Sequence, residues 1–156
     1  MPVRGRGADQ ERNREAMHVR LHATCVQIGA TGVLLLGPSG SGKSDLALRL
    51  IDAGALLVAD DQVQVERLGE RLLGRAADAL AGLIEVRGVG ILKMPYCAQS
   101  PIDLAVELAP VARLARLPES LGYSLLGIEL PRLRLDPRTP SAAAKVRLAL
   151  STERVA

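Results

Sequence analysis

The alternation of apolar and polar residues predicts two strands near the start of the chain. Residues 19–28, VRLHATCVQI, alternate as a half-buried strand does. After the turn signal GATG, residues 33–36 form a continuous apolar run, which is typical of a strand covered on both faces. We therefore expect two strands joined by a hairpin.

After the glycine-rich segment, the apolar residues recur at the spacing of a helix. In SDLALRLIDA, residues 44–53, Leu46, Leu50 and Ile51 fall on one face, and Gly54 lies where a helix commonly ends. The pattern predicts one amphipathic helix directly after the apolar strand.

Strand patterns dominate the middle of the chain. Residues 55–65 predict a buried strand containing paired acids, and residues 66–76 predict a hairpin. Residues 83–95 predict one strand interrupted by two glycines, on which Glu85 and Arg87 would share a face, either toward a ligand or as a buried ion pair.

The last third predicts more strands and a final helix. We expect an α/β fold, in which a mixed sheet containing the glycine-rich loop has flanking helices. The expected segments are a strand over 102–109, a turn-rich linker over 110–127, an alternating strand over 128–137 and a helix over 139–150 capped by Thr139 or Ser141.

Composition indicates one domain preceded by a tail. Residues 1–16 are charged and lack an apolar period, so we expect a disordered tail, and Met17 is an alternative translation start. Residues 17–156 would form the domain.

The same composition excludes several classes of protein. The chain has no Phe or Trp and a net charge of +3, which does not favour nucleic-acid binding. No apolar run approaches the roughly 18 residues of a membrane span. The two cysteines are far apart and no signal-like segment precedes them, so we expect a cytoplasmic protein with reduced thiols.

The strongest chemical signal is the segment GPSGSGKS between the apolar strand and the helix. It fits the phosphate-binding loop pattern, in which backbone N–H groups surround phosphates. Lys43 would reach the β and γ phosphates and Ser44 would offer its hydroxyl to Mg²⁺, which predicts ATP as the ligand. The binding residues would be Gly37, Pro38, Ser39, Gly40, Ser41, Gly42, Lys43 and Ser44.

Three further residues could complete a phosphoryl-transfer site. Asp60 and Asp61 follow an apolar run, and adjacent strand residues point to opposite faces, so one could serve a metal and the other the attacking group. The pattern alone does not assign the two roles. His22 lies on the strand beside the loop strand, where a structural histidine and a catalytic one are both compatible with the sequence.

Together, residues 21–51, LVADDQV at 57–63 and LIEVRGVGIL at 83–92 resemble the catalytic domain of HPr kinase/phosphorylase, a bacterial enzyme family that phosphorylates a serine of the phosphocarrier HPr. The resemblance covers residues 19 to about 150. It implies an ATP- and Mg²⁺-dependent protein-serine kinase that acts on HPr or its nitrogen-system relative and assembles as a homo-oligomer, a hexamer. Removal of the phosphate is a second activity that the resemblance leaves open.

The resemblance also implies roles for individual residues. His22, Lys43, Asp61 and Arg116 would be catalytic, with Asp61 as general base. The metal ligands would be Ser44, Glu85 and Asp60.

The chain departs from the family pattern at several points. Because only the tail precedes the catalytic domain, we expect a short form of the family that consists of the C-terminal catalytic domain. Lys93 replaces an aspartate, and LDPRTPS replaces a C-terminal motif that the family ties to dephosphorylation, keeping Arg138. A small-molecule P-loop kinase and a non-catalytic nucleotide sensor are the alternatives.

Overall fold

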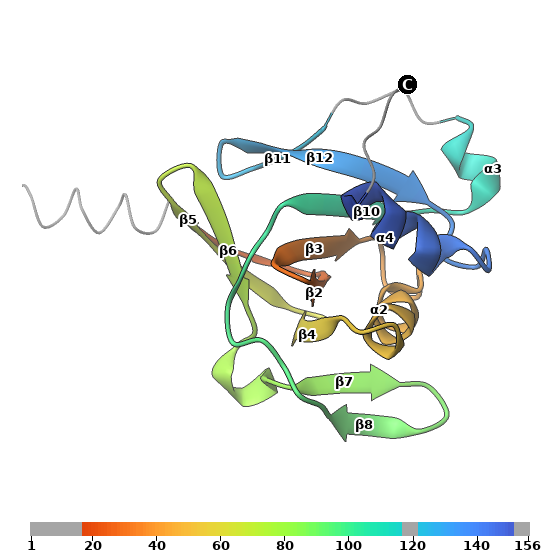
Figure 1. Cartoon of the computed structure of the whole chain (residues 1–156), viewed down its shortest axis with the longest axis horizontal. Helices are drawn as coiled ribbons and strands as arrows, with labels where there is room; N and C mark the ends of the chain where they lie inside the picture. The colour runs from red at the N-terminus through yellow and green to blue at the C-terminus, as the bar shows by residue number, and fades with distance from the viewer. Residues whose placement is uncertain (1–16, 117–121, 152–156) are drawn as a thin grey trace, which may run out of the picture.

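The central layer of the molecule is a six-stranded mixed sheet (Figure 1). The computed structural model describes residues 17–116 and 122–151, so the expected tail over 1–16 lies outside the described residues. Strands β12, β10 and β3 run parallel, and β2 lies antiparallel between β3 and β4. In order across the sheet, the strands are β11 (Gly122–Leu125), β12 (Ile128–Leu135), β10 (Leu104–Leu108), β3 (Thr31–Leu36), β2 (Thr24–Ile28) and β4 (Leu56–Ala59).

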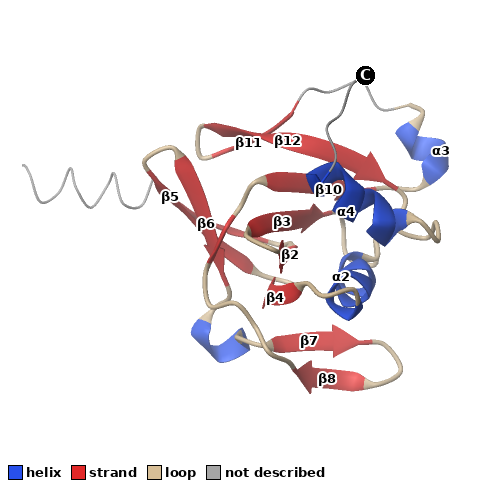
Figure 2. Ribbon diagram, in the orientation of Figure 1, coloured by secondary structure: helices blue, strands red, loops and turns tan. Residues whose placement is uncertain are grey.

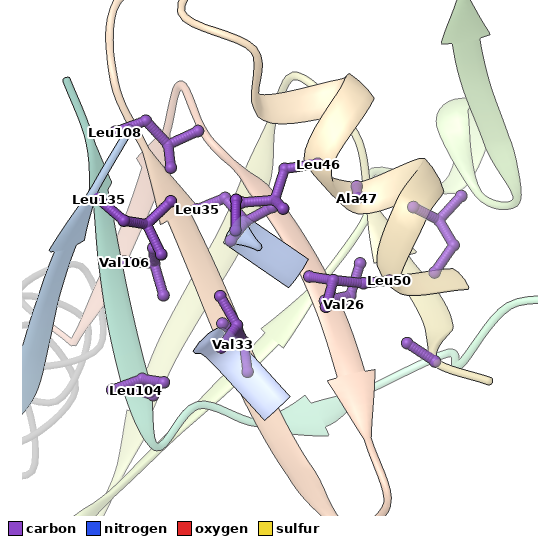
Figure 3. Close-up of a cluster of buried hydrophobic side chains, with 14 of the residues drawn as sticks. Val26, Val33, Leu35, Leu46, Ala47, Leu50, Leu104, Val106, Leu108 and Leu135 are labelled. Atoms are coloured by element: carbon purple, nitrogen blue, oxygen red, sulfur yellow. The ribbon is translucent and has the colours of Figure 1, made fainter. Parts of the chain in front are cut away.

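Helices α2 (Lys43–Asp52) and α4 (Ala142–Ser151) cover one face of this sheet. Leu46, Ala47 and Leu50 of α2 point toward Val26 and Leu35 on the sheet (Figure 3), and they belong to one buried cluster. This face is built from Leu, Val, Ile and Ala, as the absence of Phe and Trp requires. The predicted α/β fold with a mixed sheet and flanking helices is confirmed.

A second, antiparallel sheet packs on the opposite face, away from α2 and α4 (Figure 2). The two sheets approach closely where β9 meets β3, because a Cβ added at Gly32 would lie 1.7 Å from the Pro101 carbonyl oxygen. Only glycine fits there. The strands are β1 (His18–Leu21), β5 (Val63–Leu68), β6 (Arg71–Arg75) and β9 (Ser100–Pro101), in that order.

A separate two-stranded hairpin corrects the single strand expected over 83–95. Strand β7 (Leu83–Val86) follows a short 3₁₀ turn η1 (Asp78–Leu80) and pairs with β8 (Gly90–Lys93). Val89 N–H bonds to Val86 O at 3.0 Å, so the chain reverses at the glycines instead of bulging. Arg87 therefore lies in the turn, and the face expected to be shared with Glu85 does not exist.

Two other expected strands are each divided. Residues 19–28 form β1 and β2, which belong to different sheets, and the chain crosses between them at His22. Residues 55–65 form β4 and β5, which are separated by a turn at Asp60 and Asp61. Periodicity alone does not show where a continuous alternating run changes sheets.

The remaining elements follow the prediction more closely. The hairpins β2–β3 and β5–β6 and the positions of α2 and β12 are confirmed. The expected linker over 110–127 contains α3 (Val111–Leu114) and β11. Of the two expected caps, Ser141 occupies the capping position, because α4 begins at Ala142 and the Lys145 N–H bonds to Ser141 O at 2.9 Å, whereas Thr139 lies two residues earlier and its hydroxyl donates to Asp136 O at 2.8 Å. Among the described residues, no helix combines the length and apolarity that a membrane span needs.

Candidate functional site

Four loops meet at one edge of the central sheet. The glycine-rich loop follows β3, the paired acids follow β4, Pro110 follows β10 and Asp136 follows β12, all at the carboxyl ends of parallel strands. Strand β2 runs the other way, so His22, just before it, reaches the same edge. This edge is where ligands bind in open α/β sheets.

The glycine-rich loop has the conformation of an anion cradle. Gly40 and Gly42 have φ angles of 79° and 101°, which other residues rarely adopt. Ser41 N–H bonds to Pro38 O at 3.0 Å, and α2 begins at Lys43, so its first N–H groups point into the loop. The conformation depends on glycine, because a Cβ at Gly37 would lie 2.5 Å from Ser41 Oγ.

Lys43 carries a buried charge in this loop. Its side chain is 7% exposed and its Nζ donates to Gly37 O at 2.6 Å and to Pro38 O at 3.1 Å. Burial lowers the pKa of Lys43, while the nearby Asp61 and Asp60 charges oppose that shift. Ser41 Oγ is buried without a hydrogen-bond partner among the described residues. A cation held by carbonyls beside an unsatisfied hydroxyl fits a bound phosphate.

Asp60 is held by three donors. Its Oδ1 accepts hydrogen bonds from Ser44 Oγ at 2.7 Å and from Thr24 Oγ1 at 3.1 Å. Its Oδ2 accepts from the backbone N–H of Glu85 at 3.2 Å. We call Thr24, Lys43, Ser44 and Asp60 the inner group. Thr24 did not figure in the sequence interpretation, because an alternating strand gives no sign that one hydroxyl is fully buried.

Asp61 turns away from Asp60. Its φ angle is 67°, and Gln62 N–H bonds to Asp60 O at 2.7 Å across it, which forms a tight three-residue turn. The two acids diverge, as expected. The cause is this turn, and not the alternation of residues along a strand that we predicted. A positive φ at a residue other than glycine costs energy and often marks a functional position.

His22 joins Asp61 to the glycine-rich loop. Its Nδ1 lies 3.3 Å from Asp61 Oδ1, and its Nε2 is hydrogen-bonded to Ser39 Oγ at 3.2 Å. The side chains of His22 and Asp61 are 53% and 66% exposed. We call Ser39, His22 and Asp61 the outer group. The imidazole orients a solvent-facing carboxylate directly above the loop.

The other predicted site residues lie less centrally. Glu85 reaches Asp60 through its backbone, and its side chain is exposed on β7. Arg116 is exposed after α3 and is not among the residues that line the cleft beside the loop. That cleft, about 430 Å³ in volume, is lined by loop residues together with Arg113 and Arg138. The sequence interpretation gave Arg113 no role.

Asp136 fixes the far wall of this cleft. It is 6% exposed and accepts hydrogen bonds from Val111 N at 3.0 Å and from Arg138 N at 2.9 Å. The hydrogen bonds from the Arg138 side chain and backbone are the largest causes that lower the pKa of Asp136. The carboxylate thereby ties the start of α3 to the end of β12.

The residues fit a magnesium ion that is coordinated partly by protein oxygens and partly by phosphate oxygens. Among residues 17–116 and 122–151, no group of three or more His, Cys, Asp or Glu side chains could hold a metal. The Ser44 hydroxyl and the Asp60 carboxylate are adjacent oxygens at the mouth of the loop. Mg²⁺ usually keeps several waters and takes one or two protein oxygens together with substrate phosphates.

A strand, a glycine-rich loop and a helix that presents Lys43 and Ser44 define a P-loop α/β domain. The model of the HPr Serine kinase C-terminal domain family matches residues 13–136. The chain belongs to this family.

Individual relatives agree. HPr kinase/phosphorylase of Caldanaerobacter subterraneus is 38% identical over 136 residues, which cover 85% of this chain and 44% of that protein. The Clostridium tetani protein of the same name is 36% identical over 116 residues, which cover 73% of this chain and 38% of that protein. The chain thus matches less than half the length of these curated relatives.

A solved structure supports the fold. The HPr(Ser) kinase/phosphatase of Coxiella burnetii superposes with a TM-score of 0.74 at 24% sequence identity. The match covers 86% of this chain and 99% of that chain.

Proposed function

We propose that this protein is an ATP- and Mg²⁺-dependent kinase that phosphorylates a serine of HPr or of its nitrogen-system relative. One observation carries the proposal. A buried inner group suited to phosphates and an exposed outer group suited to a hydroxyl acceptor meet at the same glycine-rich loop, where His22 contacts Ser39. Family membership supplies the substrate class.

The inner group binds and orients the nucleotide. Lys43 exchanges its carbonyl partners for phosphate oxygens, and its charge balances theirs. Ser44 and Asp60 would hold Mg²⁺, which would supply charge neutralisation on the phosphates. The loop amides and Ser41 fix the phosphates for transfer.

The outer group handles the acceptor. Asp61 accepts the proton of the substrate serine as the serine oxygen bonds to the γ-phosphorus, while the bond from that phosphorus to the β–γ bridging oxygen breaks and ADP leaves. His22 holds that carboxylate over Ser39, so that it is fixed relative to the phosphates. Because Asp61 is solvent-facing, a serine on a protein surface can reach it. This explains why the base lies outside the buried part of the site.

The resemblance to the family also suggests that the protein removes the phosphate from phosphoserine and that it forms a homo-oligomer. In the reverse reaction an oxygen of inorganic phosphate attacks the phosphoserine phosphorus, the serine O–P bond breaks to leave pyrophosphate, and the same carboxylate, protonated, returns its proton to the serine oxygen. Arg138 beside the loop is a suitable contact for that phosphate. We extend the proposal to this phosphorylase reaction, to a cytoplasmic location and to a homohexamer by resemblance alone. Arg116 and the Glu85 carboxylate stay proposed contributors to the charged site.

A small-molecule kinase is the second candidate. The 430 Å³ cleft lined by Arg113 and Arg138 favours it, since it is large enough for a phosphorylated metabolite. A nucleotide sensor without turnover would not need a carboxylate oriented by a histidine. The two kinase candidates differ in the acceptor and can be separated directly.

The test is transfer of labelled γ-phosphate from Mg-ATP to the purified HPr-like carrier of the same cell. The expected product is stable in acid and labile in alkali, as phosphoserine is, and it appears with wild type and with Asp103→Asn, a distant exposed acid. Addition of inorganic phosphate then tests the reverse reaction. Tight ATP binding without transfer to a folded carrier would contradict the proposal and favour a metabolite acceptor.

A further inference from the structure

The hydroxyl of Thr24 is buried and directed at the acidic pair. Thr24 is one of only four buried polar or charged residues in the described part of the chain, and it is 0% exposed. A buried hydroxyl costs free energy unless it is hydrogen-bonded. The Thr24 hydroxyl donates to Asp60 Oδ1 at 3.1 Å, although Asp60 lies 36 residues further along the chain.

A β-bulge in β4 produces this contact. Val26 pairs with Leu57, but Cys25 pairs with Ala59, so Val58 is an extra residue on β4. Both Val58 and Ala59 consequently pack in the cluster under the second sheet, whereas Leu57 packs under α2. After the bulge, the residues of β4 therefore alternate between the two faces of the sheet with a shift of one residue.

The shift decides where Asp60 points. Without the extra residue, the register of Val26 and Leu57 would place Ala59 beside Thr24. With it, the next residue beside Thr24 is Asp60, on the face where α2 begins with Lys43 and Ser44. A slip of one residue would move the carboxylate to the opposite face of the sheet.

Thr24 and Ser44 have different tasks at the same oxygen. Both hydroxyls donate to Asp60 Oδ1, but Ser44 is partly exposed at the loop and Thr24 is fully buried in the sheet. Thr24 therefore cannot itself reach a bound ligand. Its hydroxyl fixes the carboxylate from behind while Ser44 faces the nucleotide.

We infer that Thr24 is a positioning residue that orients Asp60 for Mg²⁺ bound together with a nucleotide. This role rests on the proposed function, because it needs a magnesium-dependent nucleotide site. Partners that orient a metal ligand typically contribute about 10- to 100-fold to metal affinity. Thr24 is expected at the lower end, since Ser44 and the Glu85 N–H also hold Asp60.

The experiment measures binding of a fluorescent ADP analogue to the full chain, in EDTA and across a magnesium titration. Thr24→Val keeps the branched shape and removes the hydroxyl. The magnesium concentration that gives half of the affinity gain should rise about tenfold, while the affinity in EDTA changes less than about twofold. Thr24→Ser should restore the wild-type value. Thr24→Ala repeats the test should the valine variant not fold.

Thr31→Val is the matched control, because Thr31 lies at the other end of the sheet on β3 and should leave both affinities unchanged. An unchanged magnesium requirement in Thr24→Val and Thr24→Ala would overturn the role of Thr24, as would equal losses in EDTA and in magnesium. A wild-type protein that binds the analogue without any magnesium dependence would overturn the proposed function as well. The two failures are therefore distinguishable.

Discussion

The inner and outer groups of the site differ in burial and in how firmly they are held. In the inner group, Lys43 is 7% exposed and Asp60 accepts three hydrogen bonds. In the outer group, Asp61 is 66% exposed and its Oδ1 lies 3.3 Å from His22 Nδ1. Firm burial suits a ligand that is bound in the same way in every cycle. Exposure suits an acceptor that arrives on another protein and leaves again.

The largest expected effect removes the charge of the inner group. Lys43→Met keeps most of the aliphatic stem and loses the ammonium, so phosphate transfer to the carrier should fall about 10³-fold, and nucleotide affinity should fall with it. Transfer rates and ADP-analogue binding measure the two quantities. Lys145→Met, exposed on α4, is the control. Retained nucleotide affinity in Lys43→Met would show that the inner group does not bind phosphate.

A smaller effect is expected from the outer group. His22→Ala frees Asp61 and breaks the contact with Ser39, so the transfer rate should fall about 100-fold because the carboxylate is no longer held in place. Nucleotide affinity should change little. The matched control is His18→Ala, because His18 on β1 pairs with Glu66 on β5, away from the loop. An equal loss of nucleotide affinity in His22→Ala would contradict the separation of the site into two groups with different roles.

The smallest effect concerns a residue that belongs to neither group. Asp136→Asn removes a carboxylate whose pKa is lowered in the folded protein, chiefly by Arg138. A lowered pKa stabilises the fold above the unfolded-state pKa, near 3.9, and this stabilisation is lost as pH falls through the folded-state value. The melting temperature should drop by about 2 °C at neutral pH, and the difference from wild type should vanish in strong acid.

Melting curves from pH 7 down to pH 2 measure this difference, with exposed Asp103→Asn as the control. A difference that persists in strong acid would mean that the Asp136 charge does not stabilise the fold.

The sequence predicts the glycine-rich loop better than the contacts that the two acids make, for a physical reason. The loop, its lysine and the helix are contiguous, so their geometry follows from local backbone preferences. The pairing of His22 with Asp61 depends on a crossing between sheets and a turn with φ of 67°, which hydrophobic alternation does not encode. The alternation of apolar and polar residues likewise does not predict the bulge in β4 that directs Asp60 toward Thr24.

The hairpin of β7 and β8 teaches the same limit. Two glycines in an apolar run fit an interrupted strand and a reversal equally well. In the structure the chain reverses, β7 pairs with β8, and Ile84 packs in the buried cluster that includes α2. Likewise, the register of α3 against the loop brings Arg113, and not Arg116, to the cleft. Local patterns identify the elements, but which side chains meet is a property of the packed structure.

The most direct test of the division between the two groups compares Asp60→Asn with Asp61→Asn, each assayed for magnesium-dependent nucleotide affinity and for transfer to the carrier serine. Asp60→Asn should weaken magnesium-dependent binding at least about tenfold. Asp61→Asn should leave nucleotide affinity within about twofold and lower transfer by about 10²- to 10⁴-fold. Equal losses of binding in both variants, or transfer at the wild-type rate by Asp61→Asn, would contradict the division of the site into a binding group and a transfer group.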